Sequence, residues 1–152
     1  MSTLDAKTVT PRVGTNYLPQ FAHVVQGREK RVLGDVFGLT QFGVNLTTLA
    51  PGSASALRHW HAREDEFVFV VSGEITLVDD LGEHVLTPGM CAGFKAGVAN
   101  GHCLVNRSAG SASYIEIGTR SPDESAAYPD VDLKAVKVAG KWAYTKKDGT
   151  PY

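Results

Sequence analysis

Short apolar segments separated by turn residues run through the middle of this chain, and they restrict its fold more than any other feature. One such segment, 44–49, is rich in β-branched residues and ends at Ala50-Pro51-Gly52, and another, 66–71, ends at Ser72-Gly73. Sixteen glycines and seven prolines in 152 residues supply turns of this kind throughout. Short strands that recur every ~8–12 residues with turns between them predict an all-β antiparallel sandwich or barrel.

The regions on either side of this central series have a different pattern. Residues 1–43 predict an irregular N-terminal arm, and residues 119–152 predict a small C-terminal extension. In the extension, Ser121-Pro-Asp-Glu predicts a short helix, because the serine can cap it and proline fits its first turn. Segments 136–138 and 142–144, on either side of Ala139-Gly140, predict a hairpin. In the central region, residues 54–61 are expected to form one strand.

Charge and composition exclude several classes of partner. The net charge of −1 gives no sign of a basic surface for nucleic acid or for an anionic membrane. No apolar run approaches the ~20 residues of a membrane span, and residues 1–10 lack the apolar segment of a signal peptide. Without an export signal, Cys91 and Cys103 are expected to be buried free thiols. We therefore expect one cytoplasmic domain over residues 1–152.

A pair of histidines and a nearby carboxylate predict a metal site. His59 and His61 are two residues apart, which is the period of a strand, so both imidazoles point to one face. Glu66 has the opposite parity, so a turn at 62–65 must reset the alternation. Glu64 and Asp65 compete for the same role, but the start of the apolar strand favours Glu66. Imidazole with a carboxylate suits iron, nickel, copper or zinc.

The spacing of these residues resembles both signature motifs of the cupins. The resemblance covers about residues 44–118. The short spacing between the two motifs is similar to that in compact microbial cupins, such as those of the sugar-phosphate isomerase and dioxygenase types. Two positions depart from the pattern: the opening glycine, Gly52, is displaced by one residue, and Met90 stands where many cupins have Asp. The matching residues are His59-Trp60-His61, Glu66 and Gly73 in the first motif, and Gly82, Pro88-Gly89, His102 and Asn106 in the second.

This resemblance implies a double-stranded β-helix, which is a jelly-roll barrel with a metal inside. It implies that His59, His61, Glu66 and His102 bind one divalent transition metal ion: Zn, Fe, Mn or Ni. Four protein ligands would leave two positions of an octahedron open for substrate, water or dioxygen. The alternative is a barrel lined by histidines without a metal, as in cupins that have lost metal binding.

The function that follows is a metal-dependent enzyme acting on a small chelating substrate, of isomerase, lyase or dioxygenase type. Lys95, Asn100 and Tyr17 are candidate substrate contacts, since Lys95 and Asn100 lie on the loop before His102 and could reach a substrate anion. Tyr17, Lys95 and Tyr128 are also candidates for an acid or base, because their loops could close a barrel mouth. The main alternative is a metal- or ligand-binding sensor without turnover. A metal-free epimerase that uses a histidine as general base is a third hypothesis.

Both faces of the strand 66–71 are apolar. Phe67, Phe69 and Val71 share one face, and Val68 and Val70 lie on the other. One face is expected to line the barrel interior. The other is expected to be covered by the arm, by the C-terminal hairpin or by a second subunit. Because small cupins commonly pair through their sheets, we expect a homodimer.

Overall fold

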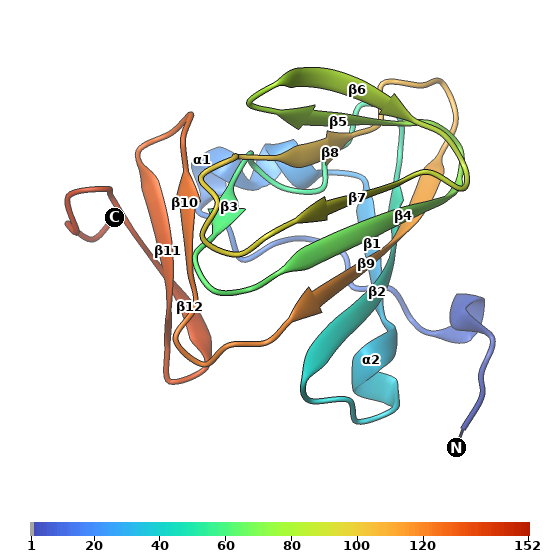
Figure 1. The fold of residues 1–152 in the computed structure, drawn as a ribbon, viewed down its shortest axis with the longest axis horizontal. Coiled ribbons are helices and arrows are strands. Elements are labelled where there is room, and N and C mark those ends of the chain that lie inside the picture. Colours follow the sequence, from blue (N-terminus) through green and yellow to red (C-terminus); the bar gives the residue numbers. More distant parts are fainter. Residues whose placement is uncertain (1) are drawn as a thin grey trace.

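The computed structural model describes residues 2–152, which fold into three antiparallel sheets with a few short helical turns (Figure 1). This confirms the expected all-β jelly-roll fold. None of the helices in the described residues is long and apolar enough to cross a membrane. The helical turns are η1 (Ala6–Thr8), α1 (Pro19–Ala22), η2 (His23–Val25) and α2 (Leu33–Val36). The strands are β1 (Arg28–Val32), β2 (Phe42–Leu49), β3 (Trp60–His61), β4 (Glu66–Ser72), β5 (Ile75–Asp79), β6 (Gly82–Leu86), β7 (Cys91–Phe94), β8 (Cys103–Val105), β9 (Ala112–Thr119), β10 (Ser125–Tyr128), β11 (Leu133–Val138) and β12 (Lys141–Thr145).

Two of the sheets enclose the main hydrophobic core. The order of the larger sheet is β1-β2-β9-β4-β7, and that of the smaller one is β6-β5-β8. Strand β4 alternates as its sequence predicts, with Val68 and Val70 buried and Phe67 and Phe69 each 41% exposed. The core between the sheets is formed by Leu49, Val68, Val70, Ile75, Leu77, Leu86, Leu104, Ala112 and Tyr114.

The third sheet is built mainly by the C-terminal extension, and it includes the strand that carries a candidate ligand. Its order is β12-β11-β10-β3, with His61 of β3 opposite Ala126 of β10. In Figure 1 strands β10, β11 and β12, in red-orange, stand at the left of the two other sheets. The pairing of β11 with β12 confirms the predicted hairpin. A second core around Tyr128 and Leu133 joins this sheet to Tyr17 and Phe21 of the N-terminal region.

Three local predictions are wrong. Residues 121–124 form a turn instead of a helix, because the Glu124 carboxylate binds backbone N–H groups of residues 62 and 63. Residues 54–61 do not form one strand, because an irregular segment separates a single bridge at Ala54 from the short β3. In this segment the Ser55 side chain accepts from the Leu104 N–H, and the Ser55 carbonyl accepts from Arg28. Cys91 is exposed, whereas Cys103 is buried as expected.

The first 43 residues are only partly the irregular arm that their composition predicts. Strand β1 pairs with β2 along its whole length and is therefore an edge strand of the larger sheet. The short helix α2 follows directly and packs beside β2. The segment before β1, which has only short helical turns, places Tyr17 beside the C-terminal sheet.

Gly73 closes the first motif at a position where no other residue fits. Its φ of 74° lies in the left-handed region. A Cβ atom added there would lie 2.7 Å from the Cα and Cβ atoms of Ala112. The turn between β4 and β5 therefore depends on glycine both for its backbone conformation and for its close approach to β9.

The Gly73→Ala variant is expected to lose about 2–5 kcal/mol of unfolding free energy, from left-handed strain and from overpacking. Gly52→Ala is the matched control, since Gly52 has a φ of 80° but open space around its Cα. It should lose only about 1–2 kcal/mol. Equilibrium urea unfolding measures both. Equal losses would contradict the role assigned to the contact with Ala112.

Candidate metal centre

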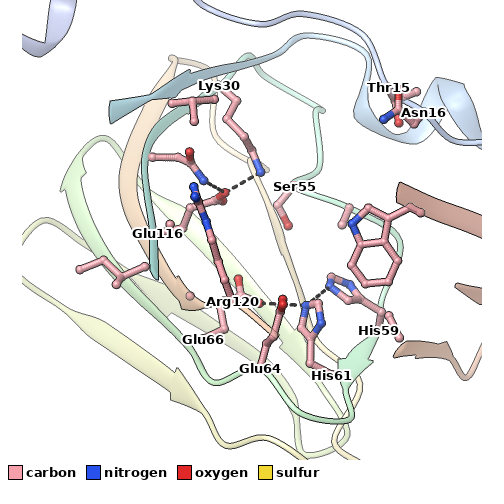
Figure 2. A pocket seen from close by; sticks show the side chains of 18 of the residues that line it. Thr15, Asn16, Lys30, Ser55, His59, His61, Glu64, Glu66, Glu116 and Arg120 are labelled. Carbon is pink, nitrogen blue, oxygen red and sulfur yellow. Dashed lines mark hydrogen bonds and ion pairs between the residues drawn. The ribbon is translucent and has the colours of Figure 1, made fainter. Parts of the chain in front are cut away.

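A cavity of about 560 Å³ lies between the larger sheet and the C-terminal sheet, and the two histidines of the first motif line it (Figure 2). Strands β1, β2 and β9 contribute charged and polar side chains, among them Lys30 and Glu116. Strands β10 and β12 contribute aromatic ones, among them Tyr128 and Trp142. The cavity therefore has one polar wall and one aromatic wall.

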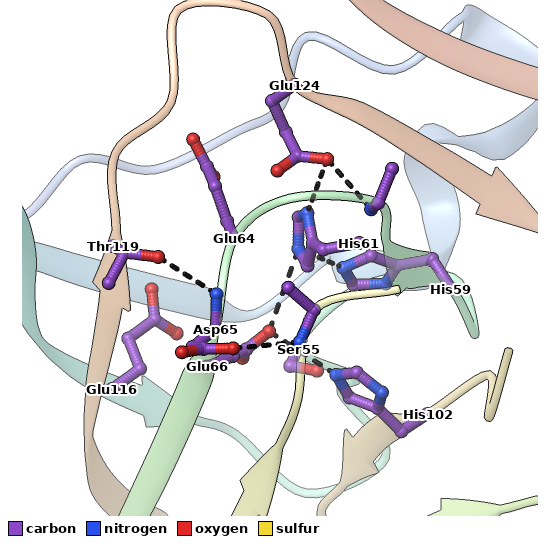
Figure 3. A network of polar contacts seen from close by, with 12 residues as sticks. Ser55, His59, His61, Glu64, Asp65, Glu66, His102, Glu116, Thr119 and Glu124 are labelled. Atoms are coloured by element: carbon purple, nitrogen blue, oxygen red, sulfur yellow. Dashed lines mark hydrogen bonds and ion pairs between the residues drawn. The ribbon is translucent and has the colours of Figure 1, made fainter. Parts of the chain in front are cut away.

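The structure brings the four predicted ligands together (Figure 3). The Nε2 atoms of His59 and His61 are 3.2 Å apart, and His61 Nε2 lies 3.7 Å from Glu66 Oε2. These three residues each offer a ligand atom within 4.8 Å of the others. His102 joins them through Glu66, whose Oε2 lies 3.3 Å from His102 Nε2.

Backbone pairing explains this convergence. His59 and His102 form an antiparallel bridge, with N–O distances of 3.1 and 2.9 Å between their main chains. The turn at 62–65 resets the strand alternation as predicted, so that Glu66 opens β4 facing the cavity. The turn is held by Asp65, whose N–H donates to Thr119 Oγ1 at 2.9 Å and whose carboxylate accepts from the Ala96 N–H at 2.8 Å.

The hydrogen bonds of two imidazoles leave their inward-facing nitrogens without protons. His59 Nδ1 lies 2.8 Å from the carbonyl of Leu57, and His102 Nδ1 lies 3.1 Å from the carbonyl of Asn100. A carbonyl oxygen can only accept, so each Nδ1 donates and each neutral ring has its lone pair on Nε2. The lone pair of His59 Nε2 faces His61 Nε2, and that of His102 Nε2 faces the Glu66 carboxylate. This set of inward-facing acceptors fits a metal ion.

The electrostatics of the site favour the same protonation states. Burial lowers the pKa of His59 to about 4, which keeps its imidazole neutral at pH 7. Burial acts to raise the pKa of Glu66, but the contacts of its carboxylate with His102 and the two other histidines outweigh burial and lower this pKa to about 2. Neutral imidazole and ionised carboxylate are the forms that bind a divalent metal.

The neighbouring carboxylates are engaged elsewhere. Glu64 accepts from Lys137 Nζ at 2.5 Å and from the Ser121 N–H at 2.7 Å. Glu124, which the sequence did not single out, is buried and accepts backbone N–H groups of the turn after His61. Its position in the sequence resembles a helix start, so no local signal pointed to the site.

Aromatic rings fix two of the histidines. The ring of Tyr128 stacks on His59 with 5.6 Å between centroids, and Phe94 stacks on His102 with 3.5 Å. Tyr17 packs edge-on against Tyr128 at 6.1 Å and lines the cavity. Tyr17, a candidate substrate contact, and Tyr128, a candidate acid or base, therefore both line the cavity.

The two other candidates do not line the cavity. Lys95 is exposed on the loop after β7. Asn100 is used to hold loops together: its side-chain oxygen accepts from the Asp80 N–H at 2.9 Å. Its carbonyl is also the acceptor that orients His102. Asn100 thus supports the site through its backbone.

The positive charges of the cavity are almost all balanced by carboxylates. Lys30 pairs with Glu116 at 2.5 Å, and Lys137 pairs with Glu64 at the same distance. Arg12 and Arg120 both pair with Asp35. Arg28 differs, because its guanidinium donates to the carbonyls of Gly14 and Ser55 and has no carboxylate partner within residues 2–152.

Comparisons with known proteins agree with this fold. The family model described as "Cupin domain" matches residues 45–118. A sugar phosphate isomerase of the cupin superfamily from Silicibacter pomeroyi DSS-3 is 46% identical, with 99% of this chain and 96% of that chain covered and a TM-score of 0.95. A provisionally named sugar phosphate isomerase from Acidithiobacillus ferrooxidans is 28% identical, with coverages of 82% and 80% and a TM-score of 0.75.

More distant matches share only the fold. The polyketide cyclase RemF from Streptomyces resistomycificus is 16% identical, with 78% of this chain and 79% of that chain covered and a TM-score of 0.65. No protein with a curated description matches at a significant level. The domain match, the first of these structural neighbours and the jelly-roll architecture together lead to one assignment: this chain belongs to the cupin superfamily.

Proposed function

We propose that this cupin is a metal-dependent isomerase of small phosphorylated sugars. The observation that carries the proposal is the convergence of imidazole nitrogens and the Glu66 carboxylate at the edge of a polar cavity. The choice of isomerase over lyase or dioxygenase rests on the similarity to the Silicibacter pomeroyi protein, a sugar phosphate isomerase that matches almost the whole chain.

In this proposal His59, His61, Glu66 and His102 hold one divalent ion: Zn, Fe, Mn or Ni. When bound, the ion supplies Lewis-acid polarisation of a substrate oxygen. The backbone carbonyls that accept from His59 Nδ1 and His102 Nδ1 keep the two rings in the ligating tautomer.

The chain's own residues supply binding and orientation of the sugar. Burial raises the pKa of Tyr17 and of Tyr128, so both hydroxyls stay protonated at pH 7. They can donate hydrogen bonds to sugar oxygens, while the aromatic wall that they form with Trp142 packs against the carbon skeleton.

Arg28 is suited to the phosphate group. It lines the cavity and carries the positive charge that no carboxylate within residues 2–152 balances. A planar guanidinium recognises phosphate through parallel N–H donors. A substrate bound to the metal at one end and to Arg28 at the other would be held in a single orientation.

A sensor that binds metal or a small ligand without turnover is the second hypothesis, because the same residues would serve it. Lyase or dioxygenase chemistry is compatible with the same ligand set. Only the isomerase hypothesis predicts that the protein interconverts aldose and ketose phosphates, so an assay of this interconversion separates the hypotheses.

The purified protein, reconstituted separately with Zn, Fe, Mn or Ni, is expected to interconvert aldose and ketose phosphates of five or six carbons. Coupled assays or NMR measure the interconversion. Activity should disappear on chelation and in His61→Ala. Metal and sugar phosphate binding without turnover of any pair would contradict the isomerase and favour the binding protein.

In that assay Arg28→Met tests the phosphate contact. Loss of charged hydrogen bonds worth about 1.5–3 kcal/mol should raise KM by about 10- to 150-fold. The control is Arg107→Met, whose side chain pairs with Glu83 outside the cavity. Arg28→Lys, which keeps the charge, should lie between wild type and Arg28→Met. An unchanged KM in Arg28→Met would exclude this role.

We also propose that the protein is a homodimer joined through the outer face of the larger sheet. Neither the arm nor the C-terminal hairpin covers this face: Phe67 and Phe69 are 41% exposed and Val71 is 47% exposed. Across the sheet, Phe67 pairs with Ile117, and Phe69 pairs with Ile115. The apolar rows are therefore continuous, and a second copy would offer the same surface.

Light scattering of the purified protein is expected to give twice the 16.3 kDa of one chain. Phe69→Lys should reduce this to the mass of one chain, because it places a charge in the centre of the apolar face. Val138→Lys changes a residue that is 60% exposed on β11, and it should leave the dimer intact. A wild-type monomer at micromolar concentration would refute the proposal.

A further inference from the structure

A buried carboxylate from the C-terminal extension lies behind the candidate metal centre. Glu124 immediately precedes β10, outside the residues that match the cupin domain. Its side chain has 0% relative exposure. Figure 3 shows it on the side of His61 away from Glu66 and His102. A carboxylate so fully buried needs strong partners.

Those partners are backbone N–H groups, two from the turn that follows His61 and one from the neighbouring Ser125. Glu124 Oε1 accepts from the N–H groups of Ala62 at 2.9 Å and Ser125 at 2.7 Å. The N–H group of Arg63 is shared between Oε1 at 3.2 Å and Oε2 at 3.1 Å. Glu124 thus fixes the start of the turn that connects His61 to Glu66.

Glu124 also faces the ring nitrogen of His61 that points out of the centre. Its Oε1 lies 4.0 Å from His61 Nδ1, and this Nδ1 is buried without a hydrogen-bond partner in the described residues. In His59 and His102 the corresponding atom donates to a backbone carbonyl. The carboxylate therefore occupies the place that the carbonyls take at the other two rings.

A negative charge beside Nδ1 has a definite consequence for the ring. It favours the tautomer with the proton on Nδ1, which leaves the lone pair of Nε2 directed at Glu66 and His59. A carboxylate behind an imidazole also raises the basicity of the ligating nitrogen.

A second metal site explains these contacts less well. His61, Glu64 and Glu124 do offer ligand atoms within 4.8 Å of one another. Glu64, however, is engaged by the Lys137 ammonium and the Ser121 N–H, and Glu124 is engaged by three backbone N–H groups. These donors already supply the positive charge that a second ion would bring.

We propose that Glu124 is a positioning residue of the metal centre, which fixes the 62–63 turn and the tautomer of His61. The C-terminal extension would then be part of the metal site, although the cupin motifs do not include it. This inference rests on the metal binding of the proposed function, but not on the isomerase activity.

The test is a titration of the metal-free protein with Co²⁺, followed by visible absorption. Glu124→Gln should weaken Co²⁺ binding by about 10- to 100-fold and shift the absorption bands. Asp132→Asn is the matched control, because Asp132 also lies in the extension and accepts a backbone N–H, that of Lys147 at 2.9 Å. Its affinity and spectrum should equal those of wild type.

Two further variants separate positioning from simple stability. Glu124→Asp keeps the charge and should retain more Co²⁺ affinity than Glu124→Gln, even where its metal-free form melts at a lower temperature. In a His61→Ala background, Glu124→Gln should cause no further loss of affinity. If affinity instead follows the melting temperature across these variants, Glu124 is only structural and the inference is overturned.

The outcomes also distinguish the inference from the proposed function. Wild-type affinity in Glu124→Gln would overturn the inference alone. Tight Co²⁺ binding by a wild-type protein that isomerises no sugar phosphate would overturn the isomerase alone. A wild-type protein that binds no Co²⁺ would overturn both.

Discussion

The antiparallel bridge between His59 and His102 is the contact on which the site depends. Two backbone hydrogen bonds of 3.1 and 2.9 Å join the two sequence motifs at their histidines. The bridge brings the imidazoles of His59 and His102 together, and the two-residue period of the strand adds that of His61. The larger sheet then brings Glu66 to them from β4, and the C-terminal sheet holds β3 from the opposite side.

The polar atoms around this bridge are arranged with donors outside and acceptors inside. The carbonyls of Leu57 and Asn100 take the outer protons of two rings, and Glu124 faces the third. The inner atoms are lone pairs and a carboxylate at distances of 3.2–3.7 Å. Without a cation, the Glu66 carboxylate and the facing lone pair of His102 repel each other. This repulsion is the physical reason for assigning a metal to the site.

The parts of the fold that the sequence predicted are those governed by local rules. The two-residue period placed His59 and His61 on one face, and turn residues delimited the strands from 44 to 118. The reset of parity before Glu66 followed from the same rule. The C-terminal hairpin was found because Ala139-Gly140 marks its turn, with a φ of 49° at Ala139 and 76° at Gly140.

What the sequence did not reveal depends on contacts between distant residues. Ser121-Pro-Asp-Glu satisfies the rules for a helix start, but Glu124 accepts from backbone N–H groups 61 and 62 positions earlier in the chain, and this contact replaces the helix. The strand expected over 54–61 breaks where Ser55 bonds Arg28 and Leu104. Neither partner can be identified from local periodicity. The role of Glu124 behind His61 was hidden for the same reason.

Elemental analysis by plasma mass spectrometry tests the central claim most directly. The wild-type protein and a variant carrying both His59→Ala and His61→Ala would be compared, with circular dichroism to verify that the fold survives. The account predicts close to one equivalent of a transition metal in wild type and its loss in the variant. Absence of metal from the wild type, even after reconstitution with iron, manganese, nickel and zinc, would contradict it.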